Sequence, residues 1–398
     1  MVHGENQAEA GGPSLKERLA AVASRWLPRR LRYAIQRHVN LTALKLAKRR
    51  HDDPHAEVLS SDRNTYGSPF RFGILRNAAQ YHSHYVSACL ELGVPFRVLD
   101  VYAEDWLDRI AGSGCDAFLV WPDAFLSVWG RMLKDRVNVI EDDLGFPVVP
   151  SSRELWAYED KRRMAYWLRS HGVPHPRTWV FYDLRECESF VRACDLPIVY
   201  KASFGASSSG VRIFRDRKRL ARFVRRVFST GFVPNGFDRR DRQWGSVLLQ
   251  EYLPAVKEWR MVRIGESFFG HGKGRIGDFH SGSGAVEWSV PEARHLDFLE
   301  QVTDAGGFRS MDVDVFETPE GALLVNELQT VFGAGFAVDQ LRVDGVAGRF
   351  VRSSDGAWRF EAGEFARNAC ADERIRYFIE SRRPEGPAAR SEEEKGRL

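Results

Sequence analysis

The pattern of apolar and polar positions changes at about residue 70, where short apolar runs begin to alternate with amphipathic segments. Strands are predicted at FRFGILR (70–76), PFRVLDVY (95–102) and DAFLVW (116–121), and helices at QYHSHYVSACLELG (80–93) and DWLDRIAGSG (105–114). Strands that alternate with helices favour a parallel sheet with helices on its faces. We therefore expect a small parallel α/β domain over residues 70–150.

A second domain of mixed α+β character is predicted over residues 151–340. The segment 151–172 predicts one continuous helix. Strands are predicted at TWVFY (178–182), PIVYKAS (197–203), GVRIFRD (210–216) and VLLQEYL (247–253), with a helix over 217–229. We expect residues 341–398 to be a C-terminal extension, and its tail after Arg383 has the composition of a disordered segment.

The segment MDVDVFETPEGALLVNELQT (311–330) predicts a hairpin with acids in both arms. Residues 318–321 form the predicted turn, and this register pairs Asp312 with Glu327 and Asp314 with Val325. Because residues two apart and cross-strand partners share a face, one face would carry Asp312, Asp314, Glu327 and Gln329. A slip of one residue would separate them, and solvated acids on an exposed face are the alternative interpretation.

Composition excludes some functional classes. The 398 residues contain no apolar run that could span a bilayer and no zinc-type spacing, and the five cysteines form no CxxC pair. These features are typical of a cytoplasmic protein. Residues 14–50 carry eleven Lys and Arg against one acid, in a chain whose net charge is +4.

Within this basic segment Leu15, Leu19, Val22 and Trp26 follow helical spacing, so we expect residues 1–69 to form a basic helical extension. Such a helix could contact an anionic surface, although a solvated helix packed on its own domain explains the same pattern. No nucleic-acid-reading motif accompanies the charge, so specific nucleic-acid binding is not expected. The sequence is compatible with a homodimer.

The segment LPIVYKASFGASSSGVRIF (196–214) carries Lys201 on a strand, followed by a loop of Gly and Ser that returns into a second strand. Glycines allow backbone N–H groups to approach an anion, and serines add hydroxyl donors. The lysine precedes the glycines, which excludes a Walker loop, and no helix follows them, which excludes a dinucleotide fingerprint. An ordinary hairpin explains this segment equally well.

Charged residues also recur on the strands predicted at 247–265. Glu251 ends an apolar strand, and Glu258 and Arg260 share a face of the next one. A carboxylate can accept from two sugar hydroxyls, and Arg can bind phosphoryl oxygens through two hydrogen bonds. A surface ion pair is the alternative.

The segment HGKGRIGDFHSGSGA (271–285) sets Lys273, Arg275 and His280 among five glycines. This composition suits a basic loop that closes over an anionic group, while a disordered loop with incidental charge is the alternative.

Taken in their order along the chain, these segments resemble the ATP-grasp superfamily. The resemblance covers about residues 70–335, with its strongest motifs between Lys161 and Gln329. It implies the ATP-grasp fold, preceded by a parallel α/β pre-ATP-grasp domain. It further implies that ATP is held between two α+β subdomains and activates a carboxylate as an acyl phosphate, which an amine then attacks.

The resemblance also implies roles for individual residues. Lys161 corresponds to the first lysine on the nucleotide, Lys201 to the lysine on the phosphates, and Glu258 to the ribose contact. The phosphate loop would comprise Ser203, Gly205, Ser207, Ser208, Ser209 and Gly210, and the adenine hinge Glu251, Tyr252 and Leu253. Arg260, Lys273, Arg275 and His280 would lie near the reacting groups.

The stretch VNELQTVFG resembles the family's metal-binding stretch. It implies Asp314, Glu327 and Gln329 as ligands of two Mg²⁺ ions, with Asp312 behind them. Gln329 and His280 stand where the family usually has Asn and Arg, and Phe332 replaces a proline. These departures lie near the metal and the acceptor, so the resemblance implies nucleotide binding but no particular substrate.

We therefore expect an ATP- and Mg²⁺-dependent carboxylate–amine ligase. The alternatives are an ATP-grasp phosphotransferase that acts on a small-molecule or sugar acceptor, and an inactive ATP-binding module. Peptides, amino acids, uronic-acid sugars and small metabolites all remain open as acceptors.

Overall fold

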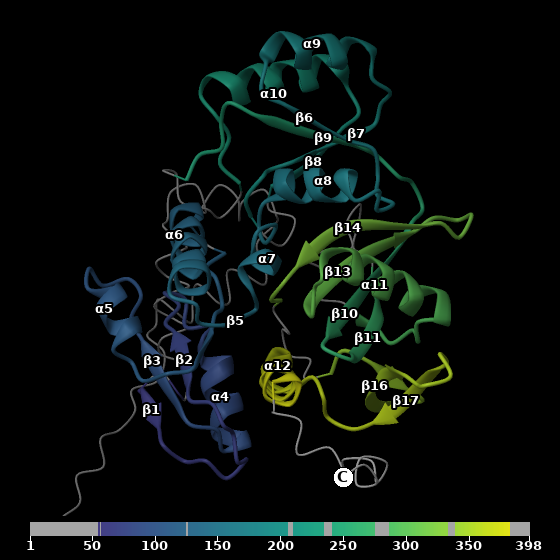
Figure 1. Ribbon diagram of the computed structural model, residues 1–398. Coiled ribbons are helices and arrows are strands. Elements are labelled where there is room, and N and C mark those ends of the chain that lie inside the picture. The colour runs from purple at the N-terminus through teal and green to yellow at the C-terminus, as the bar shows by residue number, and fades with distance from the viewer. Residues whose placement is uncertain are drawn as a thin grey trace, which may run out of the picture.

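The computed structural model describes His55 and residues 57–124, 126–205, 210–234, 241–274, 286–332 and 339–382. These residues form three sheets, each with helices packed against it (Figure 1). Most of the predicted N-terminal extension, including the basic segment 14–50, lies outside the described residues. Among the helices in the described ranges, none is long and apolar enough to cross a membrane.

The predicted parallel α/β domain is confirmed. Its strand order is β1-β3-β2-β4-β5, with β2 to β5 parallel and β1 antiparallel to β3. The strands are β1 (Ser60–Ser61), β2 (Phe72–Leu75), β3 (Phe96–Leu99), β4 (Ala117–Leu119) and β5 (Val148–Val149). The helices are α4 (Ser83–Leu92), α5 (Trp106–Ala111) and α6 (Ser127–Asn138), which continues into η1 (Val139–Asp143). The sheet thus begins ten residues before the boundary expected at residue 70.

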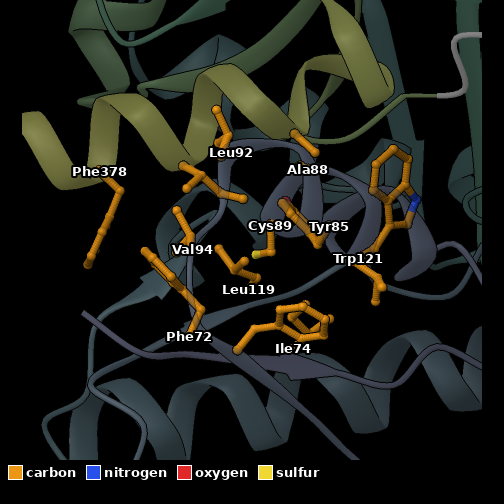
Figure 2. Packing of buried hydrophobic residues seen from close by; sticks show 14 of the residues in the cluster. Phe72, Ile74, Tyr85, Ala88, Cys89, Leu92, Val94, Leu119, Trp121 and Phe378 are labelled. Carbon is orange, nitrogen blue, oxygen red and sulfur yellow. The ribbon is translucent and has the colours of Figure 1, made fainter. Parts of the chain in front are cut away.

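The last described helix, α12 (Arg367–Ser381), packs on this domain rather than extending away from it. Figure 2 shows Phe378 of α12 lying against the core residues of β2, and the ring centroids of Phe378 and Phe72 are 5.4 Å apart. The expected C-terminal extension, residues 341–398, therefore contains a helix whose apolar residues complete the core of the N-terminal domain.

The central subdomain is a four-stranded antiparallel sheet with two helices. Its order is β6-β9-β7-β8, formed by β6 (Thr178–Phe181), β7 (Ile198–Lys201), β8 (Val211–Phe214) and β9 (Val247–Glu251). Helices α9 (Leu184–Ala193) and α10 (Arg217–Ser229) bury their apolar stripes against it. In α10 the buried residues Leu220, Phe223, Val224 and Val227 follow helical spacing, which explains why its predicted range is correct.

The C-terminal sheet has eight strands and supplies the acidic hairpin. Its main order is β14-β13-β10-β11-β16-β15, with β12 beside β11 and β17 beside β16. The strands are β10 (Lys257–Ile264), β11 (Ser267–Lys273), β12 (Val286–Glu287), β13 (Ser310–Glu317), β14 (Leu323–Gln329), β15 (Arg342–Val343), β16 (Val346–Arg352) and β17 (Trp358–Ala362). Helix α11 (Ala293–Gly306) packs its apolar residues on this sheet. The sheet continues past residue 340, the expected end of the second domain.

The single helix predicted over residues 151–172 is wrong. Two helices occupy this segment, α7 (Ser152–Leu155) and α8 (Lys161–Ser170), and α8 lies between the central sheet and β14 (Figure 1). Glu159 has a left-handed φ of 50°, and the Asp160 carboxylate accepts hydrogen bonds from the first turn of α8. This cap starts a new helix at Lys161, whose backbone N–H donates to Ser203 O at 2.9 Å.

Candidate active site

The acidic hairpin presents its polar residues on one face, but in a different register from the one predicted. Asp314 is the cross-strand partner of Glu327, and Asp312 is the partner of Gln329. The turn is one residue longer than predicted, because Glu317 pairs with Leu323. A β-bulge then adds a second extra residue, Asn326, between Val325 and Glu327 of β14. Because two residues are added in total, the side chains return to the face that was predicted. The predicted common face is therefore confirmed, and the predicted pairs are wrong.

The bulge also brings Asn326 to Lys201, a residue of the other sheet. Asn326 is buried, and its Oδ1 accepts a hydrogen bond of 2.7 Å from Lys201 Nζ. The central sheet and the acidic hairpin therefore meet through this pair. The sequence argument did not single out Asn326, since a bulge cannot be read from the alternation of a strand.

Three cations lie among the carboxylates of this face. Lys161 Nζ is 2.9 Å from Glu327 Oε1, and Lys273 bridges Glu258, at 3.0 Å, and Asp314. Arg260 Nε lies 3.1 Å from Asp312 Oδ2, although the two atoms lack hydrogen-bond geometry. This last contact is therefore a close approach without a hydrogen bond. Lys273 ends strand β11, whereas the sequence placed it in a loop.

Burial sets the protonation of these groups. Burial lowers the pKa of Lys201 to about 8, although Glu327 opposes the shift. Burial raises the pKa of Asp312 to about 8 despite the proximity of Arg260. Burial also disfavours ionised Glu327, but Lys161 and then Lys201 outweigh it and hold the pKa of Glu327 at about 2. Glu327 is therefore an anion at neutral pH, and Lys201 retains a labile proton.

The predicted phosphate loop is described only at its two ends. Ala202 N donates to Gly210 O at 3.0 Å, and a Cβ at Gly210 would lie 2.4 Å from the Cβ of Ala202, so this close approach requires glycine. Gly205 O accepts a hydrogen bond of 2.9 Å from Lys161 Nζ. The Ser203 hydroxyl bonds to Asp160 and Arg162 instead of facing Lys161. Ser207, Ser208 and Ser209 lie outside the described residues.

The predicted adenine hinge follows strand β9. Both carboxylate oxygens of Glu251 accept hydrogen bonds from Arg177, one from its backbone N–H at 2.6 Å and one from Nε at 2.7 Å. Tyr252 and Leu253 come next and are half-buried. Because both oxygens of the Glu251 carboxylate already accept hydrogen bonds from Arg177, adenine would hydrogen-bond to the backbone groups of this hinge. Glu258, expected at the ribose, is buried against Lys273.

One residue of this face was missed in the sequence. His271 is the cross-strand partner of Arg260 and lies two residues before Lys273 on the same strand face. Burial lowers the pKa of His271 to about 4, so its imidazole is neutral at physiological pH. The spacing of two from Lys273 is the signal that could have identified it. Arg275 and His280, also expected here, lie outside the described residues.

The oxygen donors suit Mg²⁺, but they are not assembled around a metal position in this conformation. Among the described residues, no group of three or more His, Cys, Asp or Glu side chains is placed to hold a metal ion. Lysine amines lie between the acids instead. Asp314 Oδ1 is nevertheless buried without a hydrogen-bond donor, and its cross-strand partner Glu327 is ionised. Hard, ionised oxygen donors on adjacent strands fit a divalent cation that displaces the lysines.

The chain is similar in sequence to curated N5-carboxyaminoimidazole ribonucleotide synthases from Mycobacterium bovis and Mycobacterium tuberculosis. Identity is 28% over 187 residues, which are 46% of this chain and 42% of each relative. The chain thus matches less than half the length of these relatives. No family model matches the chain.

Solved structures share the fold. A D-alanine–D-alanine ligase from Bacillus anthracis has a TM-score of 0.51 at 16% identity, covering 79% of this chain and 99% of that one. The biotin carboxylase domain of a Hydrogenobacter thermophilus 2-oxoglutarate carboxylase also has a TM-score of 0.51 at 16% identity, covering 67% and 65%. Its structure contains MgADP, ADP and bicarbonate.

These neighbours have the architecture that the motif order implied. In this chain an α/β domain, a central sheet and a larger C-terminal sheet make up that fold, and Lys161, Lys201 and the acidic hairpin lie where the two later sheets meet. The solved structures thus share the fold of this chain, and the sequence similarity to the curated synthases covers less than half of it.

Proposed function

We propose that this chain is an ATP- and Mg²⁺-dependent ligase that activates a carboxylate as an acyl phosphate and joins it to an amine. One observation carries the proposal. Lys161, Lys273 and Arg260 pair with Asp314 or Glu327 where the central and C-terminal sheets meet, and Lys201 bonds to the adjacent Asn326. Four cations beside two potential metal ligands match the charge of a nucleoside triphosphate with its metal.

The ion pairs of the free protein suggest how the nucleotide is accommodated. Lys161 and Lys273 neutralise Glu327 and Asp314 in the absence of ligand. A divalent cation on these carboxylates would release both amines, which could then bind phosphate oxygens. Each charge keeps a partner in both states, so the exchange avoids the cost of an unpaired buried charge.

The proposed metal ligands are Asp314, Glu327 and Gln329. Mg²⁺ would there neutralise the charge that develops on the transferred phosphoryl group. Asp312 is better suited to orienting Arg260, because it is fully buried beside that guanidinium and burial raises its pKa. Arg260 would in turn stabilise negative charge on the reacting oxygens.

The reaction proceeds in two displacements. A carboxylate oxygen of one substrate attacks the γ-phosphorus of ATP, and the bond to the bridging oxygen breaks to release ADP. The amine nitrogen of the second substrate then attacks the acyl carbon, inorganic phosphate leaves with the electrons of the C–O bond, and the nitrogen loses a proton. Lys273 and Arg260 supply positive charge beside these groups, and Arg275 and His280 keep the same assignment from the resemblance.

Purified protein with Mg²⁺-ATP and paired sets of carboxylates and amines tests the proposal. ADP and phosphate release should require both a carboxylate and an amine. A stable phosphorylated acceptor formed without an amine would instead identify a phosphotransferase. Glu327→Gln should abolish the ADP release, whereas Glu361→Gln, on the distant strand β17, should leave it unchanged.

Two proposals about partners remain. Residues 14–50 would contact an anionic surface, and two chains would form a homodimer. Deletion of residues 1–50 should abolish flotation with anionic vesicles, and light scattering of the intact chain should give twice the mass of one chain. Unchanged flotation or a monomer mass would contradict the respective proposal.

A further inference from the structure

A cavity lies beside the proposed nucleotide site, and Ser203, at the described start of the predicted phosphate loop, lines it. Its volume is about 760 Å³, and helix α6, the α7–α8 connection and the segments 203–204 and 241–246 line it. Lys161, Lys201, Asp314 and Glu327 are not among its lining residues. This volume is within the range of small-molecule sites.

The start of α8 separates the cavity from the nucleotide site. Asp160 lines the cavity and accepts a hydrogen bond from the Ser203 hydroxyl. The next residue, Lys161, directs its amine to Gly205 O and Glu327. Two consecutive residues thus belong to different sites, Asp160 to the cavity and Lys161 to the nucleotide site.

The floor of the cavity is acidic. Asp123 and Glu159 line it and are 1% and 6% exposed. Glu159 Oε2 is buried without a hydrogen-bond partner, and its backbone has a left-handed φ. A buried carboxylate oxygen without a donor indicates a ligand that supplies one. An ammonium group would supply such a donor together with a compensating positive charge.

Burial raises the pKa of Glu159, and the nearby cations Lys161 and then Lys134 oppose this shift. Of these two, Lys134 lines the cavity. Lys134 donates to Tyr158 O, and burial lowers the pKa of Lys134 to about 8, helped by Arg163. It therefore carries a weaker charge than an exposed lysine near that pH.

The rim of the cavity is basic. Arg131 and Arg242 are exposed, and in the described part of the chain neither has an ion-pair partner. Arg162 and Arg163 also line the cavity, and both lie near the single carboxylate of Asp160. Asp241 also lines the cavity, and its carboxylate accepts hydrogen bonds from Ser127. The four arginines outnumber Asp160 and Asp241, so the rim carries surplus positive charge that a carboxylate or phosphate could neutralise.

Four large aromatic side chains of the cavity lining are exposed, and Arg163 lies over one of them, Trp156. Trp156, Tyr166, Tyr182 and Trp244 line the cavity and are 43%, 43%, 57% and 69% exposed. Tyr166 and Tyr182 are hydrogen-bonded through their hydroxyls at 3.0 Å. Exposed aromatic faces gathered in one cavity typically receive a ring by stacking.

We propose that this cavity binds the amine-bearing substrate and that this substrate is amphoteric and carries a ring. Its protonated amino group lies on Glu159 and Asp123, its ring against the aromatic residues, and its acidic group at Arg242 and Arg131. That the bound molecule is the amine substrate rests on the proposed ligase function. That the cavity binds such a molecule does not depend on it. Glu159 directly precedes Asp160 and Lys161, which places the amine beside the nucleotide site.

Tyramine phosphate is a suitable probe, because it carries an amine, a ring and a phosphate in line. Titration calorimetry of the full chain without nucleotide would measure its affinity. The same measurement with tyramine and with phenyl phosphate gives the comparison, because each of these fragments lacks one of the two charged groups. We expect the complete probe to bind at least tenfold more tightly than either fragment. Glu159→Gln and Arg242→Gln should each weaken binding at least fivefold, and Arg222→Gln, on the exposed face of α10, should not.

Trp244→Ala provides a second variant if Glu159→Gln does not fold, and should also weaken the probe at least fivefold. Equal affinities for probe and fragments, or unchanged affinity in both Arg242→Gln and Trp244→Ala, would overturn the proposed site. Failure of the ligase proposal would appear separately, as the absence of ADP release with every substrate pair.

Discussion

Lys161 Nζ lies 2.9 Å from Glu327 Oε1, with both side chains largely shielded from solvent. A residue proposed to bind the nucleotide is therefore the counterion of a residue proposed to bind the metal. This pair joins the first residue of α8 to β14. The ligand-free site consequently depends on an ion pair that the ligand must break.

Glu327→Gln should separate the two roles of this pair. The substitution leaves the buried ammonium of Lys161 without its anion, so the free energy of unfolding of the ligand-free protein should fall by about 3 kcal/mol. Urea unfolding would measure this loss. The double variant Lys161→Met/Glu327→Gln should recover most of the stability but no ADP release. Mg²⁺-dependent ADP release at the wild-type rate in Glu327→Gln would exclude the metal assignment.

Lys201 should make stability depend on pH. Because its folded pKa of about 8 lies below the ordinary lysine value, the unfolded chain binds more protons between about pH 8 and 10.5. The stability of the wild type relative to Lys201→Met should therefore rise over this range, by at most about 3 kcal/mol. Urea unfolding of both proteins at several pH values tests this. A constant difference would contradict the shifted pKa.

Lys201→Met should also lose nucleotide affinity without losing stability at pH 7. The variant removes a buried ammonium whose described hydrogen bond is to the neutral Asn326 amide. We expect ADP to bind at least tenfold more weakly, measured by calorimetry, while the melting temperature stays equal or rises. Unchanged ADP affinity would remove Lys201 from the proposed phosphate site.

Asn326→Asp provides a complementary test of the same contact. A carboxylate at the position of Asn326 Oδ1, 2.7 Å from Lys201 Nζ, should raise the pKa of Lys201. The rise in the free energy of unfolding between about pH 8 and 10.5 that Lys201 causes should then disappear. ATP should bind more weakly, because the new anion repels the phosphates and competes for the amine. Tighter ATP binding would contradict this arrangement.

Glu154→Gln should weaken the connection between α7 and the acidic hairpin. Glu154 Oε1 accepts from the backbone N–H groups of Arg309 and Ser310 at 2.7 and 2.6 Å, and Oε2 accepts from Ser151 N at 2.8 Å. A glutamine amide cannot accept at both positions, so we expect a loss of about 2 kcal/mol in unfolding free energy. Glu361→Gln serves as a control, and equal stability of the two variants would contradict this role.

Local chemistry determined much of this protein from its sequence. The apolar spacing of α10 defines its range, and the alternating pattern of residues 70–121 predicts the parallel domain. The ATP-grasp fold, in contrast, was implied by the resemblance of the motifs from Lys161 to Gln329 to a known family. The local features have a simpler origin. Such features can be read from the sequence because they depend on neighbouring residues and on periods of two or 3.6.

Other features were decided by contacts between distant residues. The break before α8 depends on Asp160 and on the bond from Lys161 N to Ser203 O, and the bulge at Asn326 accompanies its contact with Lys201. Helix α12 joins the N-terminal core through Phe378, which is distant from it in sequence. Propensity and periodicity carry no information about such long-range pairings. Tertiary structure therefore decided which lysine faces which carboxylate, and thus the electrostatics of the site.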